Sequence, residues 1–211
     1  QLKSAFHLFT ACAAGNFSVP GSGKTTVVLS VFQCLKELEK VNNIFVVGPL
    51  SCHHAWVSEY SKCFGAWPSV NILGGGDLQF TEKKFTSIKS VKEREYIYTN
   101  NHIKTLNLST FATVMNDIDY LEQYIGRAKP ILVIDEAHNI KREGGNWASA
   151  ILKLASCTKY KTILTGTPMP QSYSDLFNLF DFLLLENSPL DKNLKNKISK
   201  LEEKGNIQKA Q

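Results

Sequence analysis

The sequence predicts an α/β domain whose central sheet is mostly parallel and is covered by helices on both faces. Three observations support this. Short apolar segments alternate along the chain with stretches whose apolar residues recur at helical spacing. Some of these segments, such as 131–134 (ILVI), are apolar at every position, as a strand buried on both faces requires. Glycine and proline stop others, for example Gly48 and Pro49 after residue 47.

The first half of the chain contains three expected helices and three expected strands. One face of the segment after Lys24 carries Val28, Phe32 and Leu35, which is helical spacing. The segment VNIL is bounded by three glycines and reads as a strand. On this basis we expect helices over 2–14, 25–40 and 53–64, and strands over 16–19, 44–47 and 70–73.

The second half repeats the alternation after a segment that is hard to assign. Residues 77–103 are polar and lysine-rich, and we expect a connection with one short helix. Beyond it, apolar periodicity predicts helices over 111–125, 148–154 and 172–185, and strands over 104–108, 131–134 and 161–164.

The composition changes after Pro189. Residues 1–189 are expected to form one lobe, and residues 190–211 a separate lysine-rich helical segment. Four apolar residues in that segment recur at helical spacing: Leu190, Leu194, Ile198 and Leu201. We interpret the segment as a solvated helix with one buried face, with a nucleic-acid contact as the alternative.

The overall composition is that of an ordinary globular protein, with 43% hydrophobic and 20% charged residues. The formal net charge of +5 is compatible with a phosphate-bearing partner without requiring one. The five cysteines form no C-x-x-C pair, which indicates reduced thiols in an intracellular protein, cytoplasmic in a bacterium or nuclear in a eukaryote. No run of 18 apolar residues occurs, so no membrane span or membrane partner is predicted.

A phosphate-binding loop is predicted at residues 18–26 (SVPGSGKTT), between a strand and a helix. Glycines allow a tight turn that presents N–H groups to phosphate oxygens, and the helix dipole adds positive charge. Lys24 would reach the β- and γ-phosphates of ATP, and the Thr25 hydroxyl would bind Mg²⁺. Ser18 stands where the strict pattern has glycine. The predicted nucleotide-binding residues here are Pro20, Gly21, Ser22, Gly23, Lys24, Thr25 and Thr26.

An acidic site is predicted at the end of the strand in residues 131–139 (ILVIDEAHN). Ligands of open α/β sheets bind at the carboxyl ends of strands. Asp135 would hold Mg²⁺ together with Thr25, and Glu136 would orient and deprotonate the attacking water. His138 could couple this site to a neighbouring motif. With Lys24, these three residues form the predicted catalytic set; a helix start that merely favours acids would explain the carboxylates but not the upstream loop.

DEAH after a strand, with SGKT upstream, resembles superfamily 2 helicases, and further segments resemble Swi/Snf-type ATPases in the expected order. These segments are 45–60 (FVVGPLSCHHAWVSEY) for motif Ia, 106–111 (LNLSTF) for motif Ib and 163–168 (ILTGTP) for motif III. The resemblance implies the N-terminal RecA-like lobe of a P-loop NTPase. Gln1 lies where the family places the glutamine that reads the adenine edge. The family's usual DEMGLGKT is replaced by FSVPGSGKT, so the chain is expected to be a divergent member.

The resemblance also implies roles in nucleic-acid contact and coupling. Ser51, Ser109 and Thr110 would touch the nucleic-acid backbone, and Ser51 could be a helix N-cap instead or as well. Within motif III, Thr165, Gly166 and Thr167 would link the ATP state to the nucleic-acid state. We expect His53 and His54 to be surface histidines, and Trp56 to belong to the core.

The expected function is a nucleic-acid-stimulated ATPase that translocates on duplex DNA. The second RecA-like lobe supplies arginine fingers in such motors, so this chain alone should hydrolyse ATP very slowly, since such a finger contributes roughly 10³–10⁵ in rate. Three alternatives stay open: an RNA or DNA helicase, a restriction or defence-system motor, and a nucleotide-gated binding module without motor activity. A small-molecule P-loop kinase would leave the motif Ia and III resemblances unexplained.

Overall fold

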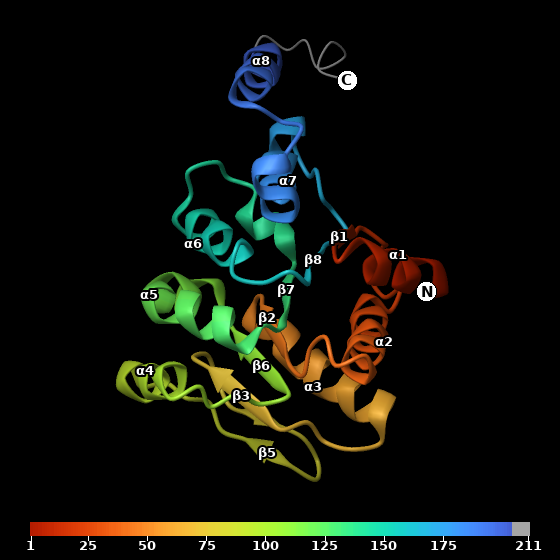
Figure 1. Cartoon of the computed structure of the whole chain (residues 1–211), viewed down its shortest axis with the longest axis vertical. Helices are drawn as coiled ribbons and strands as arrows, with labels where there is room; N and C mark the ends of the chain where they lie inside the picture. The colour runs from red at the N-terminus through yellow and green to blue at the C-terminus, as the bar shows by residue number, and fades with distance from the viewer. Residues whose placement is uncertain (204–211) are drawn as a thin grey trace.

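The computed structural model describes residues 1–203 and shows one six-stranded sheet at the centre of the chain (Figure 1). Every pair of neighbouring strands is parallel, so all six carboxyl ends lie at the same edge. Across the sheet, the strands follow the order β1 (Ala13–Asn16), β8 (Lys161–Leu164), β7 (Ile131–Asp135), β2 (Ile44–Val47), β6 (Leu106–Ser109) and β3 (Val70–Leu73). The predicted α/β, RecA-like fold class is confirmed.

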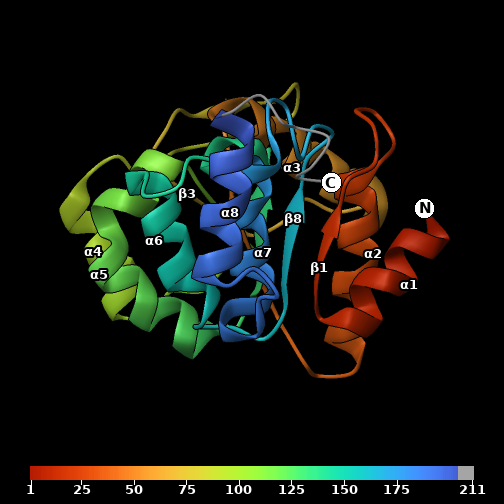
Figure 2. The same ribbon diagram turned by 90° about the horizontal axis from the view of Figure 1, so that it is seen from above.

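Helices cover both faces of this sheet (Figure 2). One face is covered by α1 (Leu2–Ala11), α2 (Lys24–Glu37) and α3 (Leu50–Phe64), and the other by α4 (Val91–Thr99), α5 (Phe111–Ala128), α6 (Asn146–Ala155) and α7 (Phe177–Leu184).

The central strands supply side chains to both layers in alternation. Ile44 and Val46 of β2 pack in the cluster beneath α1 to α3, whereas Phe45 and Val47 pack in the cluster beneath α4 to α7. All four side chains are fully buried. This is why the sequence of the strand is apolar at every position, because successive side chains point to opposite faces.

The first strand lies three residues earlier than predicted, and the helix before it is shorter. α1 ends at Ala11, because Cys12 adopts a left-handed backbone conformation (φ 61°). β1 then pairs with β8, Ala13 opposite Lys161. Alanine and glycine have low strand propensity, so the sequence of β1 gave no local signal. Pairing with a fully buried neighbour makes this segment a strand.

The segment 77–103 contains more structure than the predicted single helix. Besides α4, it forms the short antiparallel pair β4 (Leu78–Gln79) and β5 (Lys84–Phe85). The Trp67 ring lies 4.9 Å from the Phe80 ring and 5.8 Å from the Phe85 ring, centroid to centroid. This small aromatic cluster packs the hairpin onto the domain. Only tertiary contact reveals it, because the aromatic residues are scattered in a polar segment.

Other boundaries differ by a few residues. α3 begins at Leu50 rather than residue 53, and β6 begins at Leu106 rather than residue 104. The helix predicted over 172–185 is divided into a 3-10 turn, Tyr173–Leu176, the helix α7, and a second 3-10 turn, Leu185–Asn187. A further 3-10 turn, Ala137–Ile140, follows β7.

The lysine-rich helix predicted after Pro189 is present as α8 (Lys192–Glu203). The Glu202 carboxylate accepts hydrogen bonds from the backbone amides of Tyr173 (2.6 Å) and Ser174 (3.3 Å), which attaches α8 to the turn before α7. The remainder of the predicted segment, residues 204–211, lies outside the described residues.

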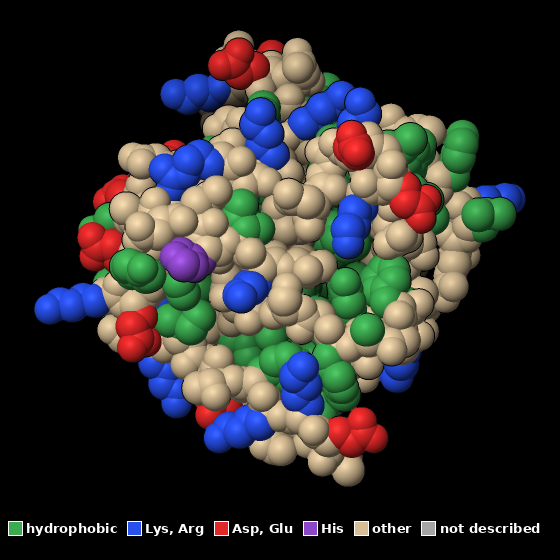
Figure 3. Space-filling model, turned by 60° about the horizontal axis from the view of Figure 1, so that its bottom comes forward, with side chains coloured by type: hydrophobic (Ala, Val, Ile, Leu, Met, Phe, Trp, Pro, Cys, Tyr) green, Lys and Arg blue, Asp and Glu red, His purple; other side chains and the backbone are tan. Residues whose placement is uncertain are grey.

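Lysine and arginine side chains are spread over the face seen in Figure 3, interspersed with acidic, apolar and neutral groups. Net charge alone therefore does not locate a nucleic-acid surface here.

At the start of the chain, Leu2 and Phe6 expose 85% and 68% of their surfaces on α1. Within residues 1–203, no helix combines the length and apolar character needed to cross a membrane.

Candidate active site

The predicted phosphate loop connects β1 to α2 at the carboxyl edge of the sheet. Gly21 and Gly23 have positive φ angles of 76° and 82°, which L side chains rarely adopt. The first intrahelical hydrogen bond of α2 runs from the Val27 amide to the Gly23 carbonyl, 3.0 Å. The amides of the preceding residues in the first turn therefore have no intrahelical acceptor and are available to an anion.

Two side chains lie against this loop. The Lys24 ammonium donates to the carbonyls of Ser18 (3.0 Å) and Val19 (3.3 Å). The Gln1 amide donates to the Ser22 carbonyl (3.1 Å), and a Cβ at Gly23 would lie only 2.3 Å from the Gln1 nitrogen. The positive φ favours glycine at Gly23, whereas the Gln1 amide is the end of a flexible, exposed side chain that can shift.

Thr25 and Thr26 occupy different surroundings at the start of α2. The Thr26 hydroxyl donates to the Glu59 carboxylate of α3 at 3.3 Å. The Thr26 hydroxyl therefore faces α3. Thr25 is half-buried beside Lys24 in the first turn, at the position where the phosphate-loop pattern has the hydroxyl that binds Mg²⁺.

The acidic residues lie at the end of β7, two strands from the loop. Asp135 is 9% exposed, and its Oδ1 accepts from the Glu136 amide at 2.9 Å. Its Oδ2 accepts from the indole N–H of Trp56 at 2.9 Å. Glu136 itself has a φ of 49°, in the left-handed region that costs a non-glycine residue energy. Such strain persists where the surrounding structure fixes it, and here it turns the half-exposed Glu136 side chain away from the strand.

His138 connects Glu136 to the TGTP segment. Its Nδ1 lies 3.3 Å from a Glu136 carboxylate oxygen and 3.3 Å from the Thr165 hydroxyl. The Thr165 hydroxyl in turn accepts from the Thr167 amide at 3.1 Å. Thr165 is fully buried, so these contacts form a defined polar path from the acidic site to the loop after β8.

The same loop packs on the phosphate loop. A Cβ at Gly166 would lie 2.8 Å from Cδ of Pro20, closer than real Cβ atoms approach. Three segments far apart in the sequence therefore meet at one end of the sheet, around Lys24, Glu136 and His138. This grouping follows from the strand order, because β8 lies between β1 and β7.

The oxygen donors suit a hard divalent cation. Among the described residues Asp135 forms no ion pair, and the Trp56 indole and the Glu136 amide each donate to one of its oxygens, which leaves lone pairs for a further partner. Carboxylate and hydroxyl oxygens are ligands that Mg²⁺ accepts, usually with water. Asp135 and Thr25 thus fit the predicted metal role by their chemistry.

The residues predicted to contact nucleic acid differ from one another in exposure and in hydrogen-bond partners. Ser51 is exposed in the first turn of α3, which begins at Leu50 and has Pro49 as its N-cap, so the N-cap alternative for Ser51 is wrong. Thr110 caps α5 by accepting from the Thr113 amide at 3.2 Å. Ser109 corrects the prediction: it is fully buried and its hydroxyl donates to the Leu73 carbonyl at 3.4 Å, so that hydroxyl faces the sheet.

The interpretation of His53 as a surface residue is wrong, whereas Trp56 belongs to the core as predicted. His53 is fully buried, with Nε2 3.3 Å from the Ser109 carbonyl. Burial lowers the pKa of His53 despite the opposing effects of that contact and of Asp135. His54 stays exposed and stacks on Phe80 with ring centroids 4.1 Å apart. Helical periodicity could have separated the two histidines, because His53 lies three residues before the buried Trp56.

The lowered pKa of His53 predicts a pH dependence of stability. The unfolded chain protonates His53 near 6.5, while the folded chain resists protonation until lower pH. The unfolded state therefore binds more protons in that window, and stability is lost as the pH falls from 6.5 toward the folded pKa. We expect His53→Leu to flatten this part of the dependence, measured by urea unfolding between pH 5 and 8. The exposed His54→Leu is the matched control, and equal slopes in the two variants would contradict the expectation.

Comparison with known proteins places these observations in a family. The SNF2-related domain family matches residues 19–207. The DNA excision repair protein ERCC-6-like of Mus musculus is 24% identical over 164 residues, which are 77% of this chain and 12% of that protein. The chromatin-remodeling ATPase INO80 of Saccharomyces cerevisiae is 27% identical over 166 residues, 78% of this chain and 10% of that protein.

The solved structure of the Sulfolobus solfataricus SWI2/SNF2 ATPase core in complex with dsDNA has the same fold, with a TM-score of 0.60 at 24% identity over 98% of this chain and 42% of that chain. The matched part of this chain spans only about a tenth of the length of each of the two curated relatives. The family match, which covers most of the sequence, shows that this chain belongs to the SNF2-related family, as the N-terminal RecA-like lobe of a superfamily 2 Swi/Snf-type ATPase.

Proposed function

We propose that this chain binds ATP with Mg²⁺ and acts as the ATP-binding lobe of a motor that translocates on duplex DNA. One observation carries the proposal most directly. The phosphate loop, the acidic end of β7 and the TGTP loop meet at the carboxyl edge of the sheet, joined by the contacts of His138 with Glu136 and Thr165. A structural loop would not need two carboxylates, free helix amides and an ammonium that, within the described residues, forms no ion pair, all at one place.

Each residue then has a chemical task. The free amides of the first turn of α2 and the Lys24 ammonium bind the phosphate oxygens, after Lys24 leaves the Ser18 and Val19 carbonyls. Glu136 accepts a proton from the attacking water. Thr25 and Asp135 hold Mg²⁺, which supplies charge neutralisation of the phosphates. Gln1 is placed beside the loop, where its amide can reach a base.

Duplex DNA as the track is supported by the family match and by the solved relative bound to dsDNA. The exposed Ser51 and the N-terminal turn of α5 at Thr110 offer hydroxyl and backbone donors at the same edge as the nucleotide residues. The proposal includes a second RecA-like lobe, which would supply arginine fingers, and near inactivity of the present lobe alone. We also propose that residues 1–189 form the lobe itself. The protein is proposed to be intracellular, cytoplasmic in a bacterium or nuclear in a eukaryote.

The test is ATP hydrolysis by the full-length protein that contains this chain, without nucleic acid and with duplex DNA, single-stranded DNA or RNA. Stimulation by duplex DNA that disappears in Glu136→Gln is the expected result. Stimulation by RNA alone would move the assignment to an RNA helicase. Nucleotide binding without stimulation by any nucleic acid would overturn the motor proposal and leave a nucleotide-gated binding module.

A further inference from the structure

The indole of Trp56 is bonded directly to the carboxylate proposed to hold the metal. Its Nε1 lies 2.9 Å from Oδ2 of Asp135, and the Trp56 side chain has no solvent exposure. Trp56 belongs to α3, whereas Asp135 ends β7, and 79 positions separate them in the sequence. An indole N–H only donates, so it can satisfy a carboxylate oxygen but cannot serve as a ligand itself.

Asp135 is held from several sides. The Glu136 amide occupies the other oxygen, Oδ1, at 2.9 Å. The backbone just after β2 approaches so closely that a Cβ at Gly48 would lie 3.1 Å from the Asp135 Cβ. The Cys52 thiol also lies beside Asp135: burial, then the Asp135 charge and a hydrogen bond to its carboxylate, raise the pKa of the thiol far above the usual range, so it stays neutral there. Of the side chains beside Asp135, the fully buried Trp56 donates to Oδ2.

The arrangement limits how the carboxylate can turn. Rotation of Asp135 about χ1 or χ2 would break the bond to Trp56 and leave a buried indole N–H without a partner, which costs free energy. The carboxylate keeps lone pairs beyond those that Trp56 and the Glu136 amide use, in directions that these donors set. Partners of this kind, which orient a metal-binding group without touching the metal, affect metal affinity strongly.

We propose that Trp56 is a positioning residue that fixes the orientation of Asp135 for Mg²⁺ and so sets the dependence of nucleotide binding on Mg²⁺. This rests on the proposed nucleotide site. Loss of the N–H should weaken the Mg²⁺-dependent part of nucleotide affinity by about 10-fold, the lower end for partners of a metal ligand. Nucleotide affinity without Mg²⁺ should stay unchanged, because the first turn of α2 and Lys24 do not depend on Trp56.

The experiment measures binding of ADP and of a non-hydrolysable ATP analogue to the full-length protein, once in Mg²⁺ and once in EDTA. Trp56→Phe removes the N–H and keeps an aromatic ring. A second variant carries benzothienylalanine at position 56, which replaces the N–H by sulfur at nearly the same shape and so guards against a packing defect. Trp147→Phe is the matched control, since Trp147 is 40% exposed and stacks on Phe111 away from Asp135.

The expected result is a smaller affinity ratio between Mg²⁺ and EDTA in both position-56 variants and an unchanged ratio in Trp147→Phe. An unchanged ratio in the benzothienylalanine variant overturns the positioning role. Equal weakening in Mg²⁺ and EDTA also overturns it, because that is the signature of a packing defect. If the unmodified protein binds no nucleotide in either condition, the proposed function fails instead, so the two failures are distinguishable.

Discussion

The Glu136→Gln variant is expected to hydrolyse ATP about 10²–10⁴-fold more slowly than the unmodified protein while still binding nucleotide. Glutamine keeps the size and the hydrogen-bonding reach of the side chain but cannot accept the proton of the attacking water. The contact of Glu136 with His138 at 3.3 Å is weak enough to tolerate the amide, so the TGTP segment should keep its position. The measurement is kcat in saturating duplex DNA, with nucleotide affinity determined in parallel.

Glu82→Gln provides the matched control, because Glu82 is exposed in the turn between β4 and β5, and it makes the same chemical change outside the site. Its kcat should equal that of the unmodified protein. A Glu136→Gln variant that keeps more than a tenth of the normal kcat would exclude Glu136 as the general base.

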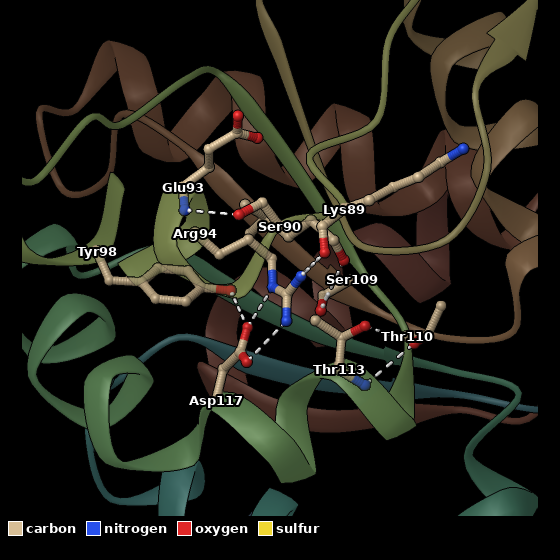
Figure 4. Close-up of polar contacts among 10 residues, drawn as sticks. Lys89, Ser90, Glu93, Arg94, Tyr98, Ser109, Thr110, Thr113 and Asp117 are labelled. Atoms are coloured by element: carbon tan, nitrogen blue, oxygen red, sulfur yellow. Dashed lines mark hydrogen bonds and ion pairs between the residues drawn. The ribbon is translucent and has the colours of Figure 1, made fainter. Parts of the chain in front are cut away.

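Replacement of Arg94 by methionine is expected to reduce the free energy of unfolding by about 3–5 kcal/mol. Figure 4 shows the guanidinium of α4 facing the Asp117 carboxylate of α5, with Tyr98 beside them. Nη2 lies 2.9 Å from Oδ1 of Asp117, and the Tyr98 hydroxyl donates to Oδ2 at 3.0 Å. The two charged side chains are only 6% and 2% exposed, so methionine would leave a buried carboxylate without its counter-charge.

Urea unfolding of the chain measures this loss, and two further variants define its origin. Lys62→Met breaks the exposed pair with Glu59, where Lys62 is 67% exposed, and should cost less than about 1 kcal/mol. The double variant Arg94→Met with Asp117→Leu removes both charges and should recover much of the stability. A loss from Arg94→Met no larger than that from Lys62→Met would show that the buried pair does not hold α4 to α5.

The buried pair also explains how the sheet edge near Thr110 is supported. Arg94 donates to the Lys89 carbonyl at 2.6 Å, and Asp117 lies two turns after the Thr110 cap on the same helix (Figure 4). The N-terminal half of α5 is therefore held by α4 as well as by its own cap. The sequence alone did not predict the pairing of Arg94 with Asp117, because an arginine in a polar, lysine-rich segment has no local feature that predicts burial.

The sequence by itself determined the alternation of strands and helices, the phosphate loop and the DEAH end of β7, since each depends on neighbours a few positions away. Apolar periodicity and glycine placement act over one turn or one strand, so they can be read locally. Tertiary structure alone decided that Ala13–Asn16 is a strand, that Ser109 is buried, and that Trp56 and Arg94 bond to carboxylates far along the chain. The physical reason is that pairing, burial and the partners of polar groups depend on contacts between distant segments, which no local pattern encodes.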